Sequence, residues 1–425
     1  MQSKAYPHLG ETLYSATLPS GLQLRVLPKP GFRTRYAALD VHYGSAYRRF
    51  TLGGRSYDTP AGVAHFLEHK AFDLPDGDNA LQLLSANGAD PNAFTSTGDT
   101  CYFFQCAENF EENLRLLIHF VTTPCFTAET VEKERPIIGQ EIQMYLDSPD
   151  STVYENLLTQ LYAHHPIRER VLGTPESLAE ITADTLYDCF NAFYTPANMC
   201  LCVAGDVDPE EIEALAREAF PSERAEIPET DFGPAEELLP VEPLCRVQMP
   251  VAAPQYLIGA KLPLPASGAE AQRARITALL ALRTLFGPSS AFYTRLYSEG
   301  IITRNYSYDV DFSAGTATFL LGGESRDPER VLAEFKRELA AAAESGLKSA
   351  QLERCRRAAF GARLRGLEDF ESVCLSVADG VFDGYDALEA PVLLAQITKA
   401  ECETFLRGIR PEMLALSRVD PYTNT

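Results

Sequence analysis

The chain has 425 residues, of which 45% are hydrophobic, and a formal net charge of −22. Such a length exceeds one typical domain, so we expect two domains with substantial cores. The negative charge disfavours nucleic acid and anionic membranes as partners, because phosphate groups bind to cationic surfaces. No stretch approaches the ~20 apolar residues of a membrane span, and no signal peptide is recognisable. We therefore expect a cytoplasmic protein whose charge serves solubility, with a basic substrate or partner as the alternative.

Strands and helices alternate along the first half of the chain. The arrangement of apolar and polar residues predicts these elements. The predicted strands are Gln23–Pro28, Tyr36–Tyr43, Thr100–Cys106 and Met199–Gly205. The predicted helices are Pro60–Phe72, Asn79–Asn87, Glu108–Thr122, Glu129–Met144 and Glu210–Phe220.

The first of these helices carries the sequence H-x-x-E-H. His65 and His69 lie one helical turn apart on one face, so both imidazoles can reach a single Zn²⁺. Glu68 lies beside the second histidine, where a carboxylate can take a proton from the attacking water and later give it to a leaving amine. The arrangement predicts metal-assisted hydrolysis, most often of a peptide bond. The alternative is a helix with two hydrogen-bonded histidines and a surface glutamate.

The beginning and the composition of this helix favour the metal hypothesis. Thr59 followed by Pro60 predicts an N-cap and a proline at the first helical position. The apolar residues that follow nearly surround the helix, which predicts that it is buried: Ala61, Val63, Ala64, Phe66 and Leu67. Two buried histidines beside a buried glutamate need a strong reason, and a metal ion supplies one.

A third zinc ligand is expected in the segment Thr127–Met144, which reads TAETVEKERPIIGQEIQM with Thr127 as a helix cap. Glu132, Glu134 and Glu141 are the candidates, and the last two share one helical face because they are seven residues apart. We favour Glu141 as the ligand and Glu134 as a carboxylate that orients a histidine. From the spacing alone, each of these glutamates fits a solvated helix face equally well.

The remaining features of this segment concern packing. Pro136 is expected to kink the helix if it lies beyond the first turn. The apolar side of the helix is expected to consist of Ile137, Ile138 and Ile142.

The ten cysteines show no regular spacing. Cys200 and Cys202 alternate along a predicted strand, so both side chains should lie on one face of a sheet. We interpret them as small apolar side chains in a reducing compartment. A metal site at this C-x-C pair is the alternative, but it lacks a second pair of ligands.

The segment Pro221–Pro243 is rich in proline and acidic residues and has little apolar periodicity. It predicts an exposed linker, and we place the domains at 1–225 and 244–425, with the linker at 226–243. The elements predicted after it are Gln255–Lys261, Tyr306–Phe312 and Thr316–Gly322 as strands, and Glu270–Phe286, Tyr293–Gly300, Asp327–Ser345 and Ala350–Gly366 as helices. The helix over 270–286 corresponds in order to the H-x-x-E-H helix but has no histidine, which indicates a duplication with the metal lost from one copy.

These motifs together resemble the insulinase/pitrilysin family of inverzincin metallopeptidases. HFLEH is followed about seventy residues later by E-x₆-E-I-x-M, and Gly88–Thr95 is similar to the family's G-x-x-x-N-A-x-T strand. Further similar blocks are Leu172–Ser177, Tyr194–Met199 and Val203–Asp206. The length and the segments HLGETLY and HFLEHKAF resemble the half-length bacterial subgroup named for its association with elongation-factor-P modification.

The resemblance implies both a fold and a site. The fold would be α+β, with two homologous domains, each an antiparallel-rich sheet with helices on one face, enclosing a substrate chamber. His65, His69 and Glu141 would bind zinc, Glu68 would be the catalytic base, and Glu134 would be the additional acidic residue. We also expect a peptide substrate to add as an extra strand at the exposed edge formed by Asn92, Ala93, Phe94 and Thr95.

One departure from the family pattern concerns substrate activation. Family members with a complete site carry an Arg-x₆-Tyr pair after a G-x-S-S turn, and the pair stabilises the developing oxyanion. Here the turn is Gly287–Ser290, but Tyr297 stands at the arginine position and Arg304 at the tyrosine position. We therefore expect a sister subunit of the same fold that carries the Arg/Tyr pair, in a heterodimer, with a homodimer as the alternative.

Two other classes of function remain open. Some relatives of processing peptidases are non-catalytic scaffolds, although a scaffold has no need of the intact residues His65, Glu68, His69 and Glu141. A zinc hydrolase of a non-peptide substrate is the second alternative.

Overall fold

The computed structural model describes residues 1–221, 226–265 and 267–422. The chain forms two compact units, and neither is continuous in sequence. Unit 1 consists of Met1–Ile142, Arg170–Phe232 and Leu364–Leu388, and unit 2 consists of Gln143–Glu169, Gly233–Arg363 and Glu389–Thr425. Each unit thus takes one segment from the opposite half of the chain. The contiguous domains proposed from the sequence stay a prediction, and residues 222–225 at their boundary lie outside the described residues.

Unit 1 is built on a seven-stranded sheet with the order β1-β2-β3-β9-β4-β8-β7. Its strands are β1 (Gln2–Tyr6), β2 (Glu11–Thr17), β3 (Gln23–Pro28), β4 (Arg35–Val41), β7 (Ala89–Thr95), β8 (Thr100–Cys106) and β9 (Met199–Gly205). Only β3 and β9 run parallel, and all other neighbours are antiparallel. The predicted strands β3, β8 and β9 are confirmed with the predicted bounds, whereas the β1–β2 hairpin was not predicted. A small second sheet has the order β10-β5-β6, with β5 (Arg49–Leu52), β6 (Arg55–Asp58) and β10 (Glu229–Thr230).

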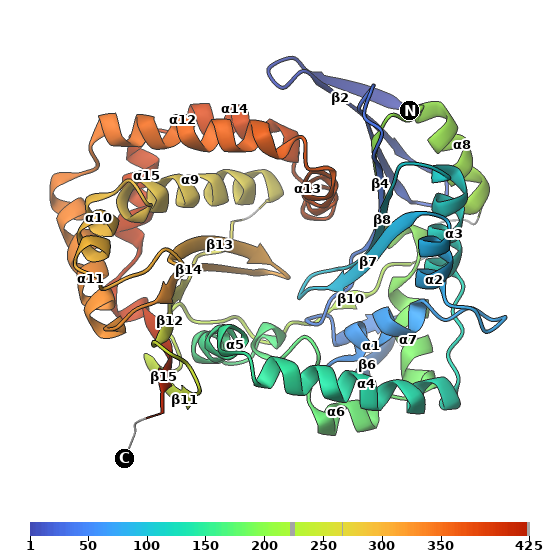
Figure 1. The fold of residues 1–425 in the computed structure, drawn as a ribbon, viewed down its shortest axis with the longest axis horizontal. Helices are drawn as coiled ribbons and strands as arrows, with labels where there is room; N and C mark the ends of the chain where they lie inside the picture. Colours follow the sequence, from blue (N-terminus) through green and yellow to red (C-terminus); the bar gives the residue numbers. More distant parts are fainter. Residues whose placement is uncertain (222–225, 266, 423–425) are drawn as a thin grey trace. The chain divides into compact units, whose positions relative to one another are not determined.

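Helices cover both faces of the seven-stranded sheet (Figure 1). On one face, Tyr102 and Phe104 of β8 contact Phe120 and Phe110 of α3 (Phe110–Thr122), and α8 (Pro209–Ala219) lies beside them. On the other face, the alternate residues of β8 share a core with α13 (Phe370–Asp383). The helices on the first face agree with the predicted architecture. The sequence did not indicate that a distant helix covers the opposite face.

The remaining helical elements of unit 1 are short, and two longer helices cross between the units. The short elements are α1 (Val63–Ala71), α2 (Ala80–Ala86), α6 (Pro175–Glu180), α7 (Ala183–Phe193) and the 3₁₀ turns η2 (Pro196–Asn198) and η3 (Ala387–Glu389). Helix α4 (Ala128–Leu146) begins in unit 1 and ends in unit 2, whereas α12 (Ser349–Gly366) begins in unit 2 and ends in unit 1. Asn79 caps α2 through its side-chain oxygen, as its position before an apolar run predicts.

Unit 2 repeats the strand plan of unit 1. Its five-stranded sheet has the order β11-β15-β12-β14-β13, which matches β3-β9-β4-β8-β7 in both order and direction. The strands are β11 (Leu244–Met249), β12 (Gln255–Lys261), β13 (Ser307–Ser313), β14 (Thr316–Glu324) and β15 (Ala415–Pro421). In both sheets the first of these five strands pairs in parallel with the last in sequence. The common topology supports the duplication that the sequence indicated.

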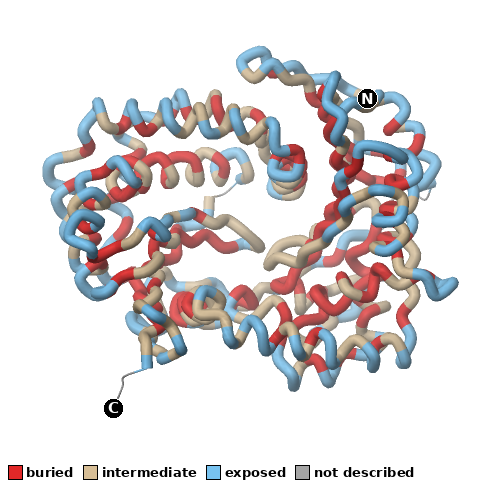
Figure 2. The backbone as a smooth tube through the Cα atoms, viewed as in Figure 1, coloured by how far each residue is buried: buried red, intermediate tan, exposed pale blue. Residues whose placement is uncertain are grey.

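Helices also cover both faces of the second sheet. The helices and 3₁₀ turns are α5 (Pro149–Leu161), η1 (Pro166–Arg168), α9 (Gly268–Phe286), α10 (Ala291–Ser298), α11 (Pro328–Ser345), α12 (Ser349–Gly366), α14 (Ala390–Gln396), α15 (Lys399–Gly408) and η4 (Pro411–Met413). Helix α5 approaches β12 so closely that a Cβ on Gly259 would lie 2.9 Å from Leu157 Cδ2. The opposite face packs on α9 and α11, where Phe319 stacks on Phe335. Figure 2 shows the buried residues concentrated in the strands and on the helix sides that meet them.

A carboxylate in the predicted linker region fastens that segment to unit 2. Glu236 accepts backbone hydrogen bonds from Ala163, His164 and His165 at 3.0, 2.6 and 2.9 Å, and its Oε2 lies 3.5 Å from Lys261 Nζ. Burial alone would raise the pKa of Glu236, but the three N–H groups and the lysine lower it below its usual 4.5. The linker is therefore bound to the folded unit at this point.

Replacing Glu236 by Gln should destabilise unit 2 by about 1–3 kcal/mol at neutral pH, because an amide cannot accept from all three N–H groups. The folded-state pKa is lowered, so the stabilisation is present above the unfolded pKa and is lost as the pH falls through the folded value. Urea unfolding followed from pH 7 downwards should show a difference between the two proteins that shrinks as the pH falls through the lowered folded-state pKa of Glu236. Glu237→Gln, at the exposed neighbouring residue, is the control. An equal loss in both variants, or one independent of pH, would contradict this account.

None of the helices in the described part of the chain combines the length and hydrophobicity that a membrane span requires.

Candidate metal centre

The helix that carries H-x-x-E-H begins later than predicted. Its N-cap is Gly62 with φ = 90°, and α1 starts at Val63. The prediction that Thr59 caps the helix was wrong, because its hydroxyl donates to the Arg48 carbonyl at 3.0 Å. A Cβ on Gly62 would lie 2.4 Å from the Leu172 carbonyl oxygen, so this position requires glycine for its conformation and for the close contact.

The burial predicted for this helix is confirmed. Eight of its nine residues are buried, including His65 and Glu68, which are 6% and 8% exposed. Burial and the neighbouring His69 lower the pKa of His65 to about 3, so this imidazole is neutral near pH 7. A neutral imidazole has the free lone pair that a metal ligand needs. The His65 Nδ1 atom is buried without a hydrogen-bond partner.

The second contributor is α4, which lies beside α1 in Figure 1. Thr127 caps α4 as predicted, since its Oγ1 accepts from the Thr130 N–H at 3.1 Å. The helix continues through Pro136. Ile138 and Ile142 are buried as predicted, but Ile137 is 55% exposed, so its assignment to the apolar side was wrong. The buried stripe of α4 is narrower than the run of isoleucines suggests.

The two helices bring three ligand atoms together. His65 Nε2 and His69 Nε2 lie 3.6 and 3.5 Å from Glu141 Oε2. Ligands bound to zinc at 2.0–2.1 Å in a tetrahedron are about 3.3 Å apart, so these positions fit a metal ion with little movement. Within residues 1–221, 226–265 and 267–422, this is the only group of three or more His, Cys, Asp or Glu side chains with such spacing.

Glu134 orients the second histidine. Its Oε1 lies 3.0 Å from His69 Nδ1, which leaves Nε2 directed toward the other ligand atoms. Burial lowers the pKa of His69, but the hydrogen bond to Glu134 and the charges of Glu68, Glu134 and Glu141 outweigh burial and raise it. The predicted role of Glu134 as a residue that positions a histidine therefore has a matching geometry. Its neighbour Glu132 instead pairs with Arg135 and is exposed.

Glu68 lies next to His69 on α1 and is buried. Burial raises the pKa of its carboxyl group and the charge of Glu141 adds to the effect, while the Thr95 hydrogen bond and His69 oppose it. A carboxylate with a raised pKa is a stronger proton acceptor. Thr95 Oγ1 donates to Glu68 Oε2 at 2.6 Å, a contact that the sequence did not reveal.

The expected substrate strand is at the edge of the sheet. Asn92, Ala93, Phe94 and Thr95 lie in β7, the terminal strand, which pairs with β8 on one side. Helix α1 packs against β7, and Thr95 of this strand contacts Glu68 of the helix. Asn92 accepts from the Ala93 N–H through its side chain at 2.9 Å.

The residues at the Arg/Tyr positions lie in unit 2 and contact each other. Arg304 Nε donates to the Tyr297 hydroxyl oxygen at 3.2 Å, and Tyr297 is 40% exposed. Tyr297 also stacks on Tyr293, with ring centroids 5.6 Å apart. The two functional groups are present, but in the reverse order of the family pattern.

The cysteines do not form a second metal centre in the described residues. All ten are free, and Cys200 and Cys202 are buried in β9. Burial raises the pKa of the Cys200 thiol, and contact with Cys374 raises the pKa of the Cys202 thiol. They are core side chains, as expected.

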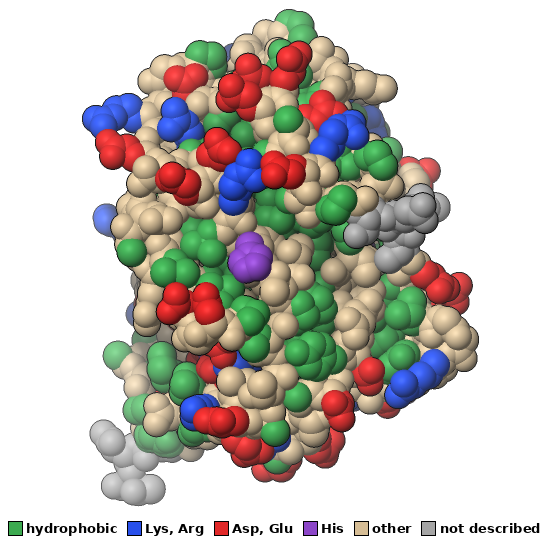
Figure 3. Space-filling model, turned by 90° about the vertical axis from the view of Figure 1, so that its right-hand side faces the viewer, with side chains coloured by type: hydrophobic (Ala, Val, Ile, Leu, Met, Phe, Trp, Pro, Cys, Tyr) green, Lys and Arg blue, Asp and Glu red, His purple; other side chains and the backbone are tan. Residues whose placement is uncertain are grey.

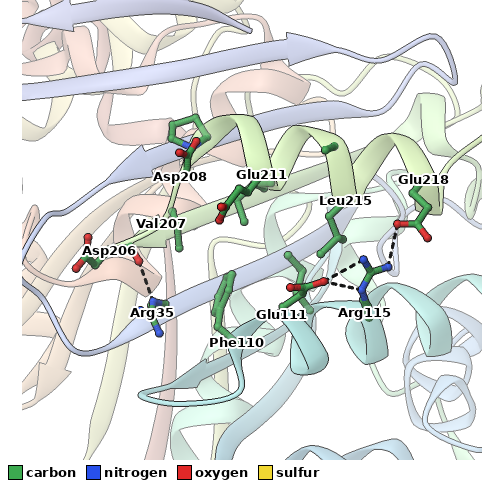
Figure 4. A pocket seen from close by; sticks show the side chains of 14 residues that line it. Arg35, Phe110, Glu111, Arg115, Asp206, Val207, Asp208, Glu211, Leu215 and Glu218 are labelled. Atoms are coloured by element: carbon green, nitrogen blue, oxygen red, sulfur yellow. Dashed lines mark hydrogen bonds and ion pairs between the residues drawn. The ribbon is translucent and has the colours of Figure 1, made fainter.

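A separate pocket of about 930 Å³ lies between α3 and α8 (Figure 4). Its apolar lining includes Phe110 and Leu215, and its rim carries Glu111 and Glu218, which both pair with Arg115. None of the residues expected at the metal centre lines it. Acidic side chains are spread over this face of the molecule in Figure 3, which fits a charge that serves solubility.

Comparisons with known proteins identify the family of this chain. The profile described as "Insulinase (Peptidase family M16)" matches residues 30–175, and the one described as "Peptidase M16 inactive domain" matches residues 180–359. The chain is 37% identical to YmfH of Bacillus subtilis, named an uncharacterized zinc protease, over 98% of both chains.

Two solved structures share the fold of this chain. The structure of an M16-like peptidase from Alicyclobacillus acidocaldarius is 30% identical, with a TM-score of 0.93 over 99% of this chain and 100% of that one. A protease from Helicobacter pylori, 17% identical over 96% of this chain and 99% of that one, shares the fold with a TM-score of 0.80. The chain belongs to the M16 (insulinase) family of metallopeptidases.

Proposed function

We propose that this chain is the zinc-bearing subunit of a metallopeptidase that hydrolyses oligopeptides or unfolded segments. One observation carries the proposal: the Nε2 atoms of His65 and His69 converge with Glu141 Oε2 beside a buried glutamate. Two imidazoles and one carboxylate are the ligand set of several zinc hydrolases, and they leave a fourth position open. The names of the relatives support zinc as the metal.

Each residue around the site would have a separate role in the hydrolysis. When bound, Zn²⁺ would supply a Lewis acid that makes water a nucleophile at neutral pH and polarises a carbonyl. Glu68 would accept the proton of the attacking water and then protonate the leaving amine. Thr95 holds the Glu68 carboxylate in place. Glu134 keeps the His69 ring in the orientation that directs Nε2 to the ligand group.

The free edge of β7 would bind the substrate. A peptide that adds there as a strand would be held by main-chain hydrogen bonds, so selectivity among side chains should be broad. The position of β7 next to α1 supports this role for Asn92–Thr95. A structure of the inactive Glu68→Gln protein with a bound peptide tests it, and a peptide that runs elsewhere would end the hypothesis.

The proposal includes a partner subunit. A sister chain would supply the Arg/Tyr donors, because Tyr297 and Arg304 stand here in the reverse order.

The proposal also includes a cellular location. The free and mostly buried cysteines support a reducing, cytoplasmic location.

Hydrolysis of a random peptide mixture, followed by mass spectrometry, tests the function. We expect cleavage at many sequences when the zinc-loaded chain is mixed with its sister chain, and none after zinc is removed by a chelator. A scaffold would show no cleavage in any mixture, with or without zinc. A hydrolase of another substrate class would hold zinc and leave every peptide intact.

A further inference from the structure

A lysine is buried directly beside the second histidine. Lys70 is 3% exposed, and its ammonium group contacts the carboxylates of Asp73 and Glu134, the latter at 3.2 Å. Burial of an ammonium group is costly unless it is paired and hydrogen-bonded. The neighbouring residues of α1 are apolar or belong to the metal centre, so a cation here needs an explanation.

The contacts of Glu134 explain why a cation is buried here. Its Oε2 binds Lys70 Nζ while its Oε1 binds His69 Nδ1, at 3.2 and 3.0 Å. Both oxygens therefore have a partner from α1, and the plane of the carboxylate is fixed. Without the lysine, the carboxylate could rotate about its single remaining contact, since its side chain is still 15% exposed to solvent.

The same ion pair joins two helices. Glu134 lies on α4, seven residues before Glu141, and Lys70 lies on α1, next to His69. The Lys70–Glu134 contact thus holds the helix that supplies one ligand against the helix that supplies the other two. A shift of either helix would change the distance between Glu141 and the histidines.

We propose that Lys70 is a positioning residue of the metal centre, which fixes the Glu134 carboxylate and through it the His69 ring and the approach of Glu141. The inference rests on the proposed function because it concerns the same metal site. It adds a residue that does not touch the metal or the reacting atoms.

If Lys70 acted only through its charge, its replacement would change the zinc affinity in the direction opposite to that expected for a positioning residue. A cation close to a metal site repels the metal, so removing its charge should strengthen zinc binding if Coulomb repulsion were its main effect. A positioning role predicts weaker binding, because the loss of a residue that orients a ligand typically costs 10–100-fold in metal affinity. The direction of the change therefore decides between the two roles.

The experiment measures the zinc dissociation constant by competition with a chromogenic chelator at constant pH. Lys70→Met nearly keeps the volume of the side chain and removes its charge. We expect this variant to bind zinc at least about 10-fold more weakly. Lys29→Met is the matched control, because Lys29 is also buried and pairs with Glu11 at 2.5 Å. The control should lower the thermal midpoint and leave zinc affinity unchanged. Unchanged or tighter zinc binding by Lys70→Met overturns the proposal.

A second pair of variants separates positioning from a general loss of structure. If Lys70 acts through Glu134, Lys70→Met should weaken zinc binding no further in a Glu134→Gln background. Equal losses in both backgrounds would overturn the proposal. Lys70→Gln, which keeps a donor but no charge, should give an intermediate loss and serves if the methionine variant does not fold. Failure of the wild-type chain to bind zinc would instead reject the proposed function.

Discussion

Replacing Glu68 by Gln should leave the zinc content of the protein unchanged and reduce peptide hydrolysis by about 10²–10⁴-fold. The amide has almost the same volume, and its oxygen can still accept the hydrogen bond from Thr95. It cannot accept a proton, so the attacking water loses its base. The ligand group of His65, His69 and Glu141 does not include this residue. The measurement is kcat/KM on a quenched peptide, together with zinc content of the same sample.

The control for this variant lies on the other helix. Glu132→Gln changes an exposed carboxylate of α4 that pairs with Arg135 and is not in the ligand group, so it should alter neither quantity. Loss of zinc together with activity in Glu68→Gln would show that the residue is a ligand or a structural support. Full activity with Gln at this position would remove Glu68 from the mechanism.

The purified chain alone should be zinc-loaded and nearly inactive on peptides, and a sister chain with Arg-x₆-Tyr should raise its activity by about 10²–10³-fold. Loss of one oxyanion donor typically costs a factor of this size. In this chain the corresponding side chains are Tyr297 and Arg304, and they are hydrogen-bonded to each other. A homodimer would supply two copies of the same reversed pair. Titration of the sister chain against a constant concentration of this one measures the gain.

Two variants make the partner experiment specific. Changing the arginine of the sister chain to alanine should remove the gain in rate while the pair still co-elutes in gel filtration. Changing Tyr297 or Arg304 of this chain should have little effect on the mixture. High activity from the purified chain alone, unaffected by either of these substitutions, would contradict the requirement for a partner.

The sequence predicted the elements that local patterns define. Short, mainly apolar runs located β3, β8, β9 and β12 with their observed bounds, and Asn79 marked the start of α2. The metal centre was predictable because H-x-x-E-H fixes two ligands within one helical turn. Spacing along one helix does not show which side faces α1, so the preference for Glu141 over Glu132 and Glu134 drew its main support from the family resemblance.

What the sequence missed depends on contacts between distant residues. The close approach of Leu172 to Gly62 delays the start of α1, and no local pattern at Thr59–Pro60 reveals it. The apolar residue Ile137 is exposed because the buried side of α4 is set by its neighbours. Lys70 reads as a surface residue at the end of a helix, and only the positions of Asp73 and Glu134 explain its burial.

Local sequence patterns also could not predict that each half of the chain contributes a helix to the sheet of the other half. Helix α5 precedes the predicted linker but packs on the sheet of unit 2, and α13 follows the linker but packs on the sheet of unit 1. Both helices have ordinary amphipathic patterns, which indicate that one side is buried but not which sheet covers it.

The most direct test of the metal centre is the zinc content per chain after equal zinc loading and gel filtration. We predict one zinc ion per wild-type chain and nearly none in His65→Ala or Glu141→Gln, because each variant removes one of the three ligands. The thermal unfolding of the metal-free variants should resemble that of the metal-free wild type, which excludes misfolding as the cause. A Glu141→Gln protein that retains one zinc ion with wild-type affinity would contradict the ligand set on which the proposed function depends.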